Sequence, residues 1–160
     1  MDEKEPTPAL AIRLATPADI ALIETLDSFS ASPTRDIHRD MEKYFGSVDP
    51  STHEHTFIFI VEVAGVTAGK AELMLPPTTT LEVVGYVKRV IVHPDFRGRG
   101  LAKKLMQHII TFARSTYHLQ AIDLHVWEKN YPAIRLYEEL GFELQHRELY
   151  YRLPIEHKIL

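Results

Sequence analysis

The stretch Val92–Met106, VHPDFRGRGLAKKLM, alternates two of the chain's seven glycines with two arginines, where an apolar strand gives way to a helix. We expect the strand over 81–94, LEVVGYVKRVIVHP, because a β-branched run there ends at Pro94. From Ala102 onward the apolar residues recur at helical spacing. The stretch therefore predicts a strand, a glycine-rich turn and a helix that begins near Gly100.

A turn of this kind predicts an anion site. The first backbone N–H groups of a helix lack partners within it and, with the positive end of the helix dipole, they favour phosphate. Gly98 and Gly100 remove side chains that would block close approach and permit a positive φ. Arg97 and Arg99 add positive charge. On physical grounds alone, a structural turn with solvated arginines remains open as the alternative.

Three better-known glycine motifs do not fit this turn. A dinucleotide fingerprint needs a third glycine where the chain has Lys103. The P-loop pattern is absent from the sequence. A disordered arginine–glycine segment for nucleic acid would be repeated, whereas this turn opens an amphipathic helix.

The remaining chain predicts alternating strands and helices. We expect further strands over 10–15, 55–65, 66–75, 121–127 and 142–153, with another in 155–160, and helices over 16–27, 31–45 and from Asn130 to Gly141. Residues 55–75 should form an antiparallel hairpin that turns near Gly65. The order β-α-α-β-β-β-α-β-α-β(-β) predicts an α/β (α+β) fold, a mixed sheet with helices on its faces. We expect a loose tail over 1–8 and a single domain over 9–160.

Composition narrows the chemistry. The chain has no cysteine, which excludes a disulfide, a thiolate metal site and a cysteine nucleophile. The net charge of -4 argues against nucleic acid as a partner and is compatible with a cationic amine substrate. No apolar run is long enough for a membrane span and the N-terminus lacks a signal-peptide pattern, so we expect no membrane partner and a cytoplasmic location. The histidines of HEH, 53–55, lack a third ligand, so no metal site is predicted.

Several separate motifs together resemble one family. Arg97, Gly98, Arg99, Gly100, Leu101 and Ala102 fit the pattern Q/R-x-x-G-x-G/A of the GNAT acyl-CoA N-acyltransferase superfamily. The preceding RVIVHP, the downstream NYPAIRLYEELGFE and the N-terminal IRLATPADIALIETL are also similar to that family, in the same order. In NYPAIRLYEELGFE the matching positions are Asn130, Ala133, Tyr137, Gly141 and Phe142. The resemblance covers almost the whole chain.

The resemblance implies an acetyl-CoA-dependent N-acetyltransferase with a mostly antiparallel central sheet and helices on both faces. Acetyl-CoA would be a co-substrate, its pyrophosphate on the backbone of Arg99–Ala102 and its pantetheine arm along the strand before the turn. The cofactor-binding residues it implies are Val90, Ile91, Val92, Arg97, Gly98, Arg99, Gly100, Leu101, Ala102, Asn130 and Ala133. Tyr137 would protonate the leaving thiolate, and dimers are common in the family, so a homodimer is compatible with it.

The sequence departs from the family pattern at the general base. Relatives carry a glutamate near the positions of Tyr86 and Lys88, yet no carboxylate lies between Gly85 and Pro94. Glu82, acting through water, is our candidate catalytic base. Glu72, His125 and deprotonation by water alone remain open as alternatives.

The acceptor is the second open question. We expect the primary amine of a small molecule. A peptide N-terminus or protein lysine is one alternative, and a non-catalytic acyl-CoA-binding module on the same fold is the other.

Overall fold

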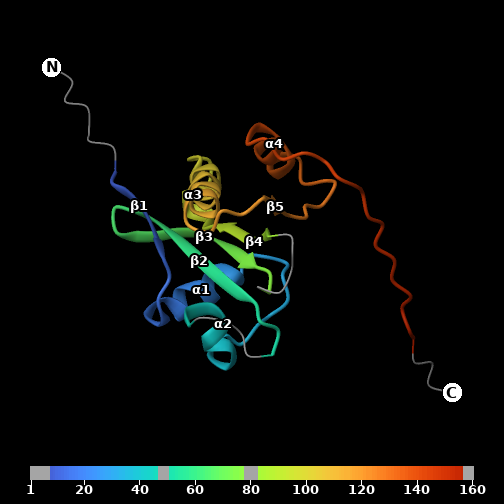
Figure 1. Cartoon of the computed structure of the whole chain (residues 1–160), viewed down its shortest axis with the longest axis horizontal. Helices are drawn as coiled ribbons and strands as arrows, with labels where there is room; N and C mark the ends of the chain where they lie inside the picture. The colour runs from blue at the N-terminus through green and yellow to red at the C-terminus, as the bar shows by residue number, and fades with distance from the viewer. Residues whose placement is uncertain (1–7, 47–50, 78–82, 157–160) are drawn as a thin grey trace. The chain divides into compact units, whose positions relative to one another are not determined.

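Five strands of the described chain form one sheet in the order β1-β2-β3-β4-β5 (Figure 1). The computed structural model describes residues 8–46, 51–77 and 83–156. The strands are β1 (Leu10–Leu14), β2 (His55–Val63), β3 (Val66–Leu75), β4 (Val84–Val92) and β5 (Ala121–Asp123). The first four pair antiparallel, and β5 runs parallel to β4. This mixed, mostly antiparallel sheet confirms the predicted fold class.

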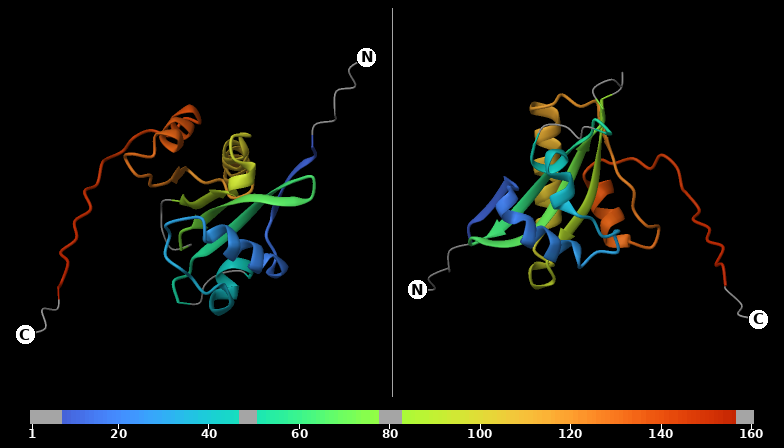
Figure 2. Two further views of the ribbon diagram at one scale, coloured as in Figure 1. Left: turned by 180° about the vertical axis from the view of Figure 1, so that it is seen from behind. Right: turned by 90° about the horizontal axis from the view of Figure 1, so that it is seen from below.

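Helices cover both faces of the sheet. The helices of the described chain are α1 (Ile20–Asp27), α2 (Met41–Phe45), α3 (Leu101–Ser115) and α4 (Tyr131–Glu139), of which the first three cover the sheet, and short 3₁₀ turns precede these three at Pro17–Asp19, Ile37–Asp40 and Pro94–Phe96. α1 and α2 pack on one face and α3 packs on the other, as Figure 1 and both views of Figure 2 show. α4 follows the sheet in sequence and belongs to the second unit described below.

Alternation along β2 builds a core on each side of the sheet. Phe57 and Phe59 face α3, where their rings lie 5.1 and 5.0 Å from the ring of Phe112. Ile58 and Ile60 face the other way and pack in a buried cluster that contains Ile20, Ile23, Ile37 and Tyr44. Because the strand period is two, one run of apolar residues serves both layers.

The turn between β2 and β3 matches its prediction. Ala64 and Gly65 both have positive φ, 50° and 79°, which is the backbone of a tight two-residue hairpin turn. The hairpin that we expected over 55–75 is therefore confirmed, with its turn at Gly65.

β4 contains a bulge near its middle. Lys88 is registered with Glu72 and Ile91 with Lys70, so two residues, Arg89 and Val90, lie opposite one residue of β3. Arg89 has a φ of 53°. Such a bulge bends a strand and increases its twist.

β4 also has a long open edge. β5 pairs only with its first three residues, Val84, Gly85 and Tyr86. Within the described residues, the rest of β4 has no partner strand on that side. β4 thus begins inside the sheet and ends as an edge.

Two predicted elements differ in length from those observed. The helix expected over 31–45 is a 3₁₀ turn followed by the short α2, because Asp36 caps the turn by accepting a hydrogen bond of 3.1 Å from the His38 amide. The strand expected over 121–127 ends at Asp123, where its pairing with β4 ends.

The predicted strand over 142–153 is wrong. The described residues 142–156 contain neither helix nor strand, and Leu149, Tyr150 and Tyr151 are about four-fifths exposed (78%, 83% and 85%). In the described part of residues 128–160, α4 is the only regular element, so no strand is there to pair with them. The predicted strand in 155–160 and the tail over 1–8 lie mainly outside the described residues.

By its internal contacts the chain divides into two compact units, residues 1–127 with the sheet and residues 128–160 with α4. Our expectation of a single domain over 9–160 stays a prediction. None of the helices in the described ranges has the length and apolar character that a bilayer span requires.

Candidate active site

The turn between β4 and α3 has the backbone that the sequence predicted. Gly98 and Gly100 lie in the left-handed region, with φ of 79° and 72°. A Cβ added at either glycine would meet no atom within 4 Å. Backbone conformation, rather than crowding inside the protein, therefore requires glycine here, and the space beside both residues is open.

α3 begins at this turn with free donors. Gly100 is its N-cap residue, and no side chain caps this end of the described helix. The first bond of the helix runs from the Lys104 amide to the Gly100 carbonyl at 3.2 Å. The amides of Leu101, Ala102 and Lys103 come before that bond, and the helix dipole adds positive potential beside them. The end of α3 can therefore bind a phosphate group.

The two arginines of the turn make contacts within the protein. The Arg97 Nε donates a hydrogen bond of 3.2 Å to the Val92 carbonyl. The Arg99 guanidinium lies 5.1 Å from the centre of the Phe96 ring. Both side chains thus help to shape the turn, and the backbone amides supply the directed donors.

The open edge of β4 is joined to this turn by the short 3₁₀ segment Pro94–Phe96. The His93 amide bonds to the Ala68 carbonyl on β3 at 2.8 Å. Because successive backbone groups of a strand face opposite sides, the N–H of Val92 faces the open edge, whereas that of Ile91 faces β3. Of the backbone contacts that we expected on β4, the structure brings Val92 to the edge, leaves Val90 in the bulge and turns Ile91 inward.

The candidate bases differ sharply in their surroundings. Glu82 lies outside the described residues. Glu72 is fully buried and forms ion pairs with Arg35 and Lys70. Burial favours its neutral form, but the hydrogen bonds from Arg35 and the charge of Lys70 outweigh this and hold the pKa of Glu72 below its ordinary value. A carboxylate held in this way is a poor base.

His125 has a partner on the central sheet. Its Nδ1 and the Tyr86 Oη share a hydrogen bond of 2.5 Å. His125 is exposed, and Tyr86 stands near the position where the resemblance places a glutamate. A phenol and an imidazole joined in this way can pass a proton between them.

The second unit holds Tyr137. It lies in the last turn of α4, its ring 5.8 Å from that of Phe142, and burial raises the pKa of its phenol. At neutral pH the phenol is therefore protonated and can act as an acid.

Two residues at the ends of α4 behave as the sequence predicted. The Asn130 side chain caps the first turn of α4 by accepting a hydrogen bond of 3.4 Å from the Ala133 amide. Gly141 follows the last turn with a φ of 98°, as a C′ glycine should.

Sequence reasoning missed a cluster of buried charges, which we call the charge cluster: Asp27, Arg35, Lys70, Glu72 and Arg89. Arg35 contacts both carboxylates, at 3.0 Å from Asp27 and 2.5 Å from Glu72. Lys70 also contacts both. A lysine and a glutamate two residues apart on a buried strand were the available signal, because they must share one face.

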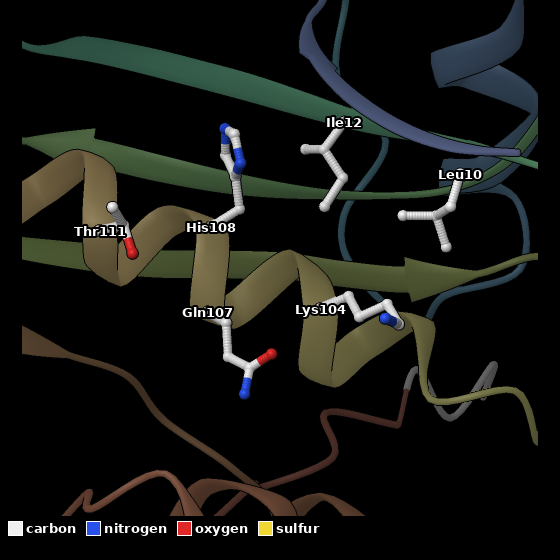
Figure 3. Close-up of a pocket in the computed structure, with 6 residues that line it drawn as sticks. All are labelled: Leu10, Ile12, Lys104, Gln107, His108 and Thr111. Carbon is white, nitrogen blue, oxygen red and sulfur yellow. The ribbon is translucent and has the colours of Figure 1, made fainter.

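A shallow hollow of about 350 Å³ lies between β1 and α3, lined by Leu10, Ile12, Lys104, Gln107, His108 and Thr111 (Figure 3). None of the residues of the glycine turn lines it. Since β1 and β4 are separated by two strands, this hollow is distinct from the open edge.

His55 and Glu54 of the HEH stretch make contacts within the protein. His55 stacks on Phe57 with ring centres 4.1 Å apart, and Glu54 pairs with Lys43 at 3.6 Å.

Comparison with known proteins adds a family and several relatives. The model of the family described as "Acetyltransferase (GNAT) family" matches residues 21–142. A glucosamine 6-phosphate N-acetyltransferase of Trypanosoma brucei brucei is 34% identical over 96 residues, which are 59% of this chain and 63% of that protein. A catalytic subunit of the N-terminal acetyltransferase B complex of Arabidopsis thaliana is 39% identical over 67 residues, 42% of this chain and 38% of the relative.

A spermine/spermidine N(1)-acetyltransferase of Bacillus subtilis (strain 168) is 33% identical over 58 residues, 36% of this chain and 38% of the relative. The chain thus spans less than two thirds of these curated relatives.

Solved structures share the fold over nearly the full length. A Trypanosoma brucei acetyltransferase has a TM-score of 0.66 at 24% identity and covers 91% of this chain and 100% of its own. The aminoglycoside N-acetyltransferase AAC(6')-Iy, solved in complex with CoA, has a TM-score of 0.72 at 19% identity and covers 96% of this chain and 99% of its own.

Proposed function

The chain belongs to the GNAT acetyltransferase family, and from that premise we propose that it transfers an acetyl group from acetyl-CoA directly to a primary amine. The observation that carries the proposal is the glycine turn at the start of α3, which follows the open edge of β4 after the short 3₁₀ segment Pro94–Phe96. One end of this surface suits a phosphate group, and the other offers an extended backbone.

The pyrophosphate of acetyl-CoA would bind at the turn. The amides of Leu101 and Ala102 are free donors, and the open space beside Gly98 and Gly100 lets phosphate oxygens approach the backbone. Arg97 and Arg99 add positive charge beside the site without being its main donors.

The pantetheine arm would lie along the open edge of β4. An extended ligand can add to a free strand edge through backbone hydrogen bonds, and the N–H of Val92 faces that edge. A donor in the bulge near Val90 would also stabilise the negative charge that develops on the thioester oxygen. The open edge thus offers donors both for holding the arm and for the reaction.

The reaction needs one proton removed and one supplied. The neutral amine attacks the thioester carbon, the carbon–sulfur bond breaks, and the products are an N-acetyl amide and free CoA. The amine loses a proton to a base, for which Glu82 through water, the His125–Tyr86 pair and solvent are the candidates. Tyr137 would give a proton to the leaving thiolate, whose ordinary pKa is about 8.5.

The acceptor class remains part of the proposal. The relatives' names include a sugar-phosphate amine, polyamines and a protein N-terminus. We propose a small-molecule amine. A peptide or protein amine is the second candidate, since one relative is a catalytic subunit of an N-terminal acetyltransferase complex.

The decisive experiment measures acetyl-CoA consumption against amino sugars, amino sugar phosphates, amino acids, polyamines and lysine peptides, with calorimetric titration of CoA in parallel. Binding of CoA with acetylation of at least one acceptor supports the proposal. CoA binding without any acetylation would favour a non-catalytic module, and the lack of CoA binding would refute the assignment of the turn.

A further inference from the structure

Lys88 lies in the middle of β4, on the face of the sheet that α1 and α2 cover. It is registered with Glu72 on β3, and it lies two residues after Tyr86 on the same face. The same strand continues to the bulge near Val90, where we propose that the thioester oxygen is stabilised, and then to the open edge at Val92. A group bound by Lys88 would therefore lie near the acceptor side of the proposed reaction.

The charge cluster beside Lys88 contains more cations than carboxylates. Arg35 and Lys70 each contact both Asp27 and Glu72, and Arg89 lies 3.7 Å from Asp27. With Lys88 added, four cations face two carboxylates, a formal excess of two positive charges. The two acids are shared among the cations of the cluster and have little capacity left for Lys88.

Lys88 itself lacks a carboxylate partner among the described residues. The contact of its Nζ is the Met74 sulfur at 3.9 Å, a weak acceptor. Its side chain is half-buried, and burial lowers its pKa. Lys43, Arg35 and Arg89 lower that pKa further, while Glu72 raises it.

We propose that Lys88 binds an anionic group, a phosphate or a carboxylate, on the acceptor amine. A half-buried ammonium among like charges gains both Coulomb energy and hydrogen bonds from a bound anion. The same excess of positive charge repels a polyamine, so the site selects against acceptors that carry several cations. The local charge around Lys88 is therefore positive, opposite in sign to the net charge of the chain, which is -4.

The inference rests on the proposed acetyl transfer for its setting, and it names the acceptor class of that same site. Asp123 on β5 is registered with Tyr86 and is exposed. Among the ion pairs of the described residues it has none with Lys88. Asp123 on β5 therefore does not neutralise Lys88, whose charge stays available for a bound anion.

The first test uses matched acceptors and four proteins. The acceptors are a hexosamine phosphate with its hexosamine, an amino acid with its amide, and a polyamine. The proteins are the wild type, Lys88→Gln, Lys88→Arg and Arg114→Gln, the last removing an exposed cation from the far end of α3. We expect the wild type to prefer the anionic member of at least one pair.

In Lys88→Gln, KM for that anionic acceptor should rise about tenfold or more, while kcat/KM for the neutral partner and KM for acetyl-CoA stay the same. Lys88→Arg should restore most of the preference, and Arg114→Gln should behave as wild type. The phosphate and carboxylate pairs show which anion is preferred. No preference in the wild type, or an equal loss for both members in Lys88→Gln, overturns the inference while leaving acetyl transfer intact.

If no amine is acetylated, a binding measurement tests the inference instead. Protein saturated with CoA, which fills the phosphate site of the turn, is titrated with a hexose 6-phosphate, a simple carboxylate and the unmodified hexose. The inference expects binding of one anion, at least tenfold weaker in Lys88→Gln and unchanged in Arg114→Gln. Binding of neither anion overturns it, whatever the fate of the proposed activity.

Discussion

The Nε of Arg97 donates a hydrogen bond of 3.2 Å to the carbonyl of Val92, so the side chain of the turn holds the end of the strand before it. The free amides of α3 and the open edge of β4 are thereby kept in one arrangement. A ligand that binds both gains from their being positioned in advance.

Replacing Arg97 with methionine tests this arrangement. An exposed hydrogen bond contributes about 1 kcal/mol, so Arg97→Met should weaken CoA binding about fivefold. Calorimetric titration measures the effect, with Arg114→Met as a control that removes an equal charge elsewhere. Equal affinities in both variants would mean that the Arg97 bond does not position the site.

Gly100→Glu should abolish CoA binding, because a carboxylate would stand where phosphate oxygens approach. Gly65→Glu is the matched control, since Gly65 also has a positive φ, 79°, and open space around it. Each variant carries backbone strain of about 1–3 kcal/mol, which urea unfolding would reveal. If the Gly65 variant lost CoA binding as well, strain rather than the site would be responsible.

Tyr137→Phe should lower kcat by about a hundredfold while leaving CoA affinity unchanged, as expected for loss of a general acid. Because burial raises the pKa of Tyr137, the phenol stays protonated beyond the ordinary tyrosine value of about 10. In the wild type, loss of this acid should therefore limit the rate only above that pH. Unchanged turnover in the variant would remove Tyr137 from the mechanism.

Glu72→Gln should lower the free energy of unfolding by about 3–5 kcal/mol, since it leaves buried cations without one of their two carboxylates. The measurement is urea unfolding at neutral pH. Glu24→Gln, which neutralises an exposed glutamate on α1, should change stability by no more than about 0.5 kcal/mol. A mild effect at Glu72 would show that the charge cluster is solvated in solution.

Stability should fall in acid, and two carboxylates are responsible. The hydrogen bonds from Arg13 lower the pKa of Asp19 to about 2, and that of Glu72 is also lowered. Their contributions are complete above the unfolded values of about 4 and are lost as the pH falls through the folded ones. Urea midpoints between pH 7 and pH 2 should drop below pH 4, and less so in Asp19→Asn. A urea midpoint that did not change between pH 7 and pH 2 would contradict the lowered pKa values of Asp19 and Glu72.

Local chemistry made much of the fold predictable. Gly65, Gly100 and Gly141 mark a hairpin turn, a helix start and a helix end, and each has the positive φ that its position requires. Asn130 predicted the start of α4, because the side chain of an N-cap residue bonds to an amide only three residues away. Each of these signals depends on residues within a few positions of one another, so it can be read directly from the sequence.

The charge cluster and the element lengths depend on distant partners. Arg35 meets Glu72 across 37 positions, a pairing that neither residue's neighbours indicate. The strand expected over 121–127 stops where β4 stops pairing with it. Residues 142–153 have strand character in the sequence, but the described part of residues 128–160 contains no strand to pair with them. The missing base, Glu82, was chosen by strand alternation alone, and this candidate stays a prediction.

The bulge at Arg89 and Val90 also protects the protein from its own exposed backbone. An unpaired strand edge is a template on which another chain can add and aggregate. Twist from the bulge makes this edge a poor match for a flat strand. The edge can accept a slender, flexible ligand while discouraging a second protein chain, so the bulge contributes to solubility as well as to the proposed site.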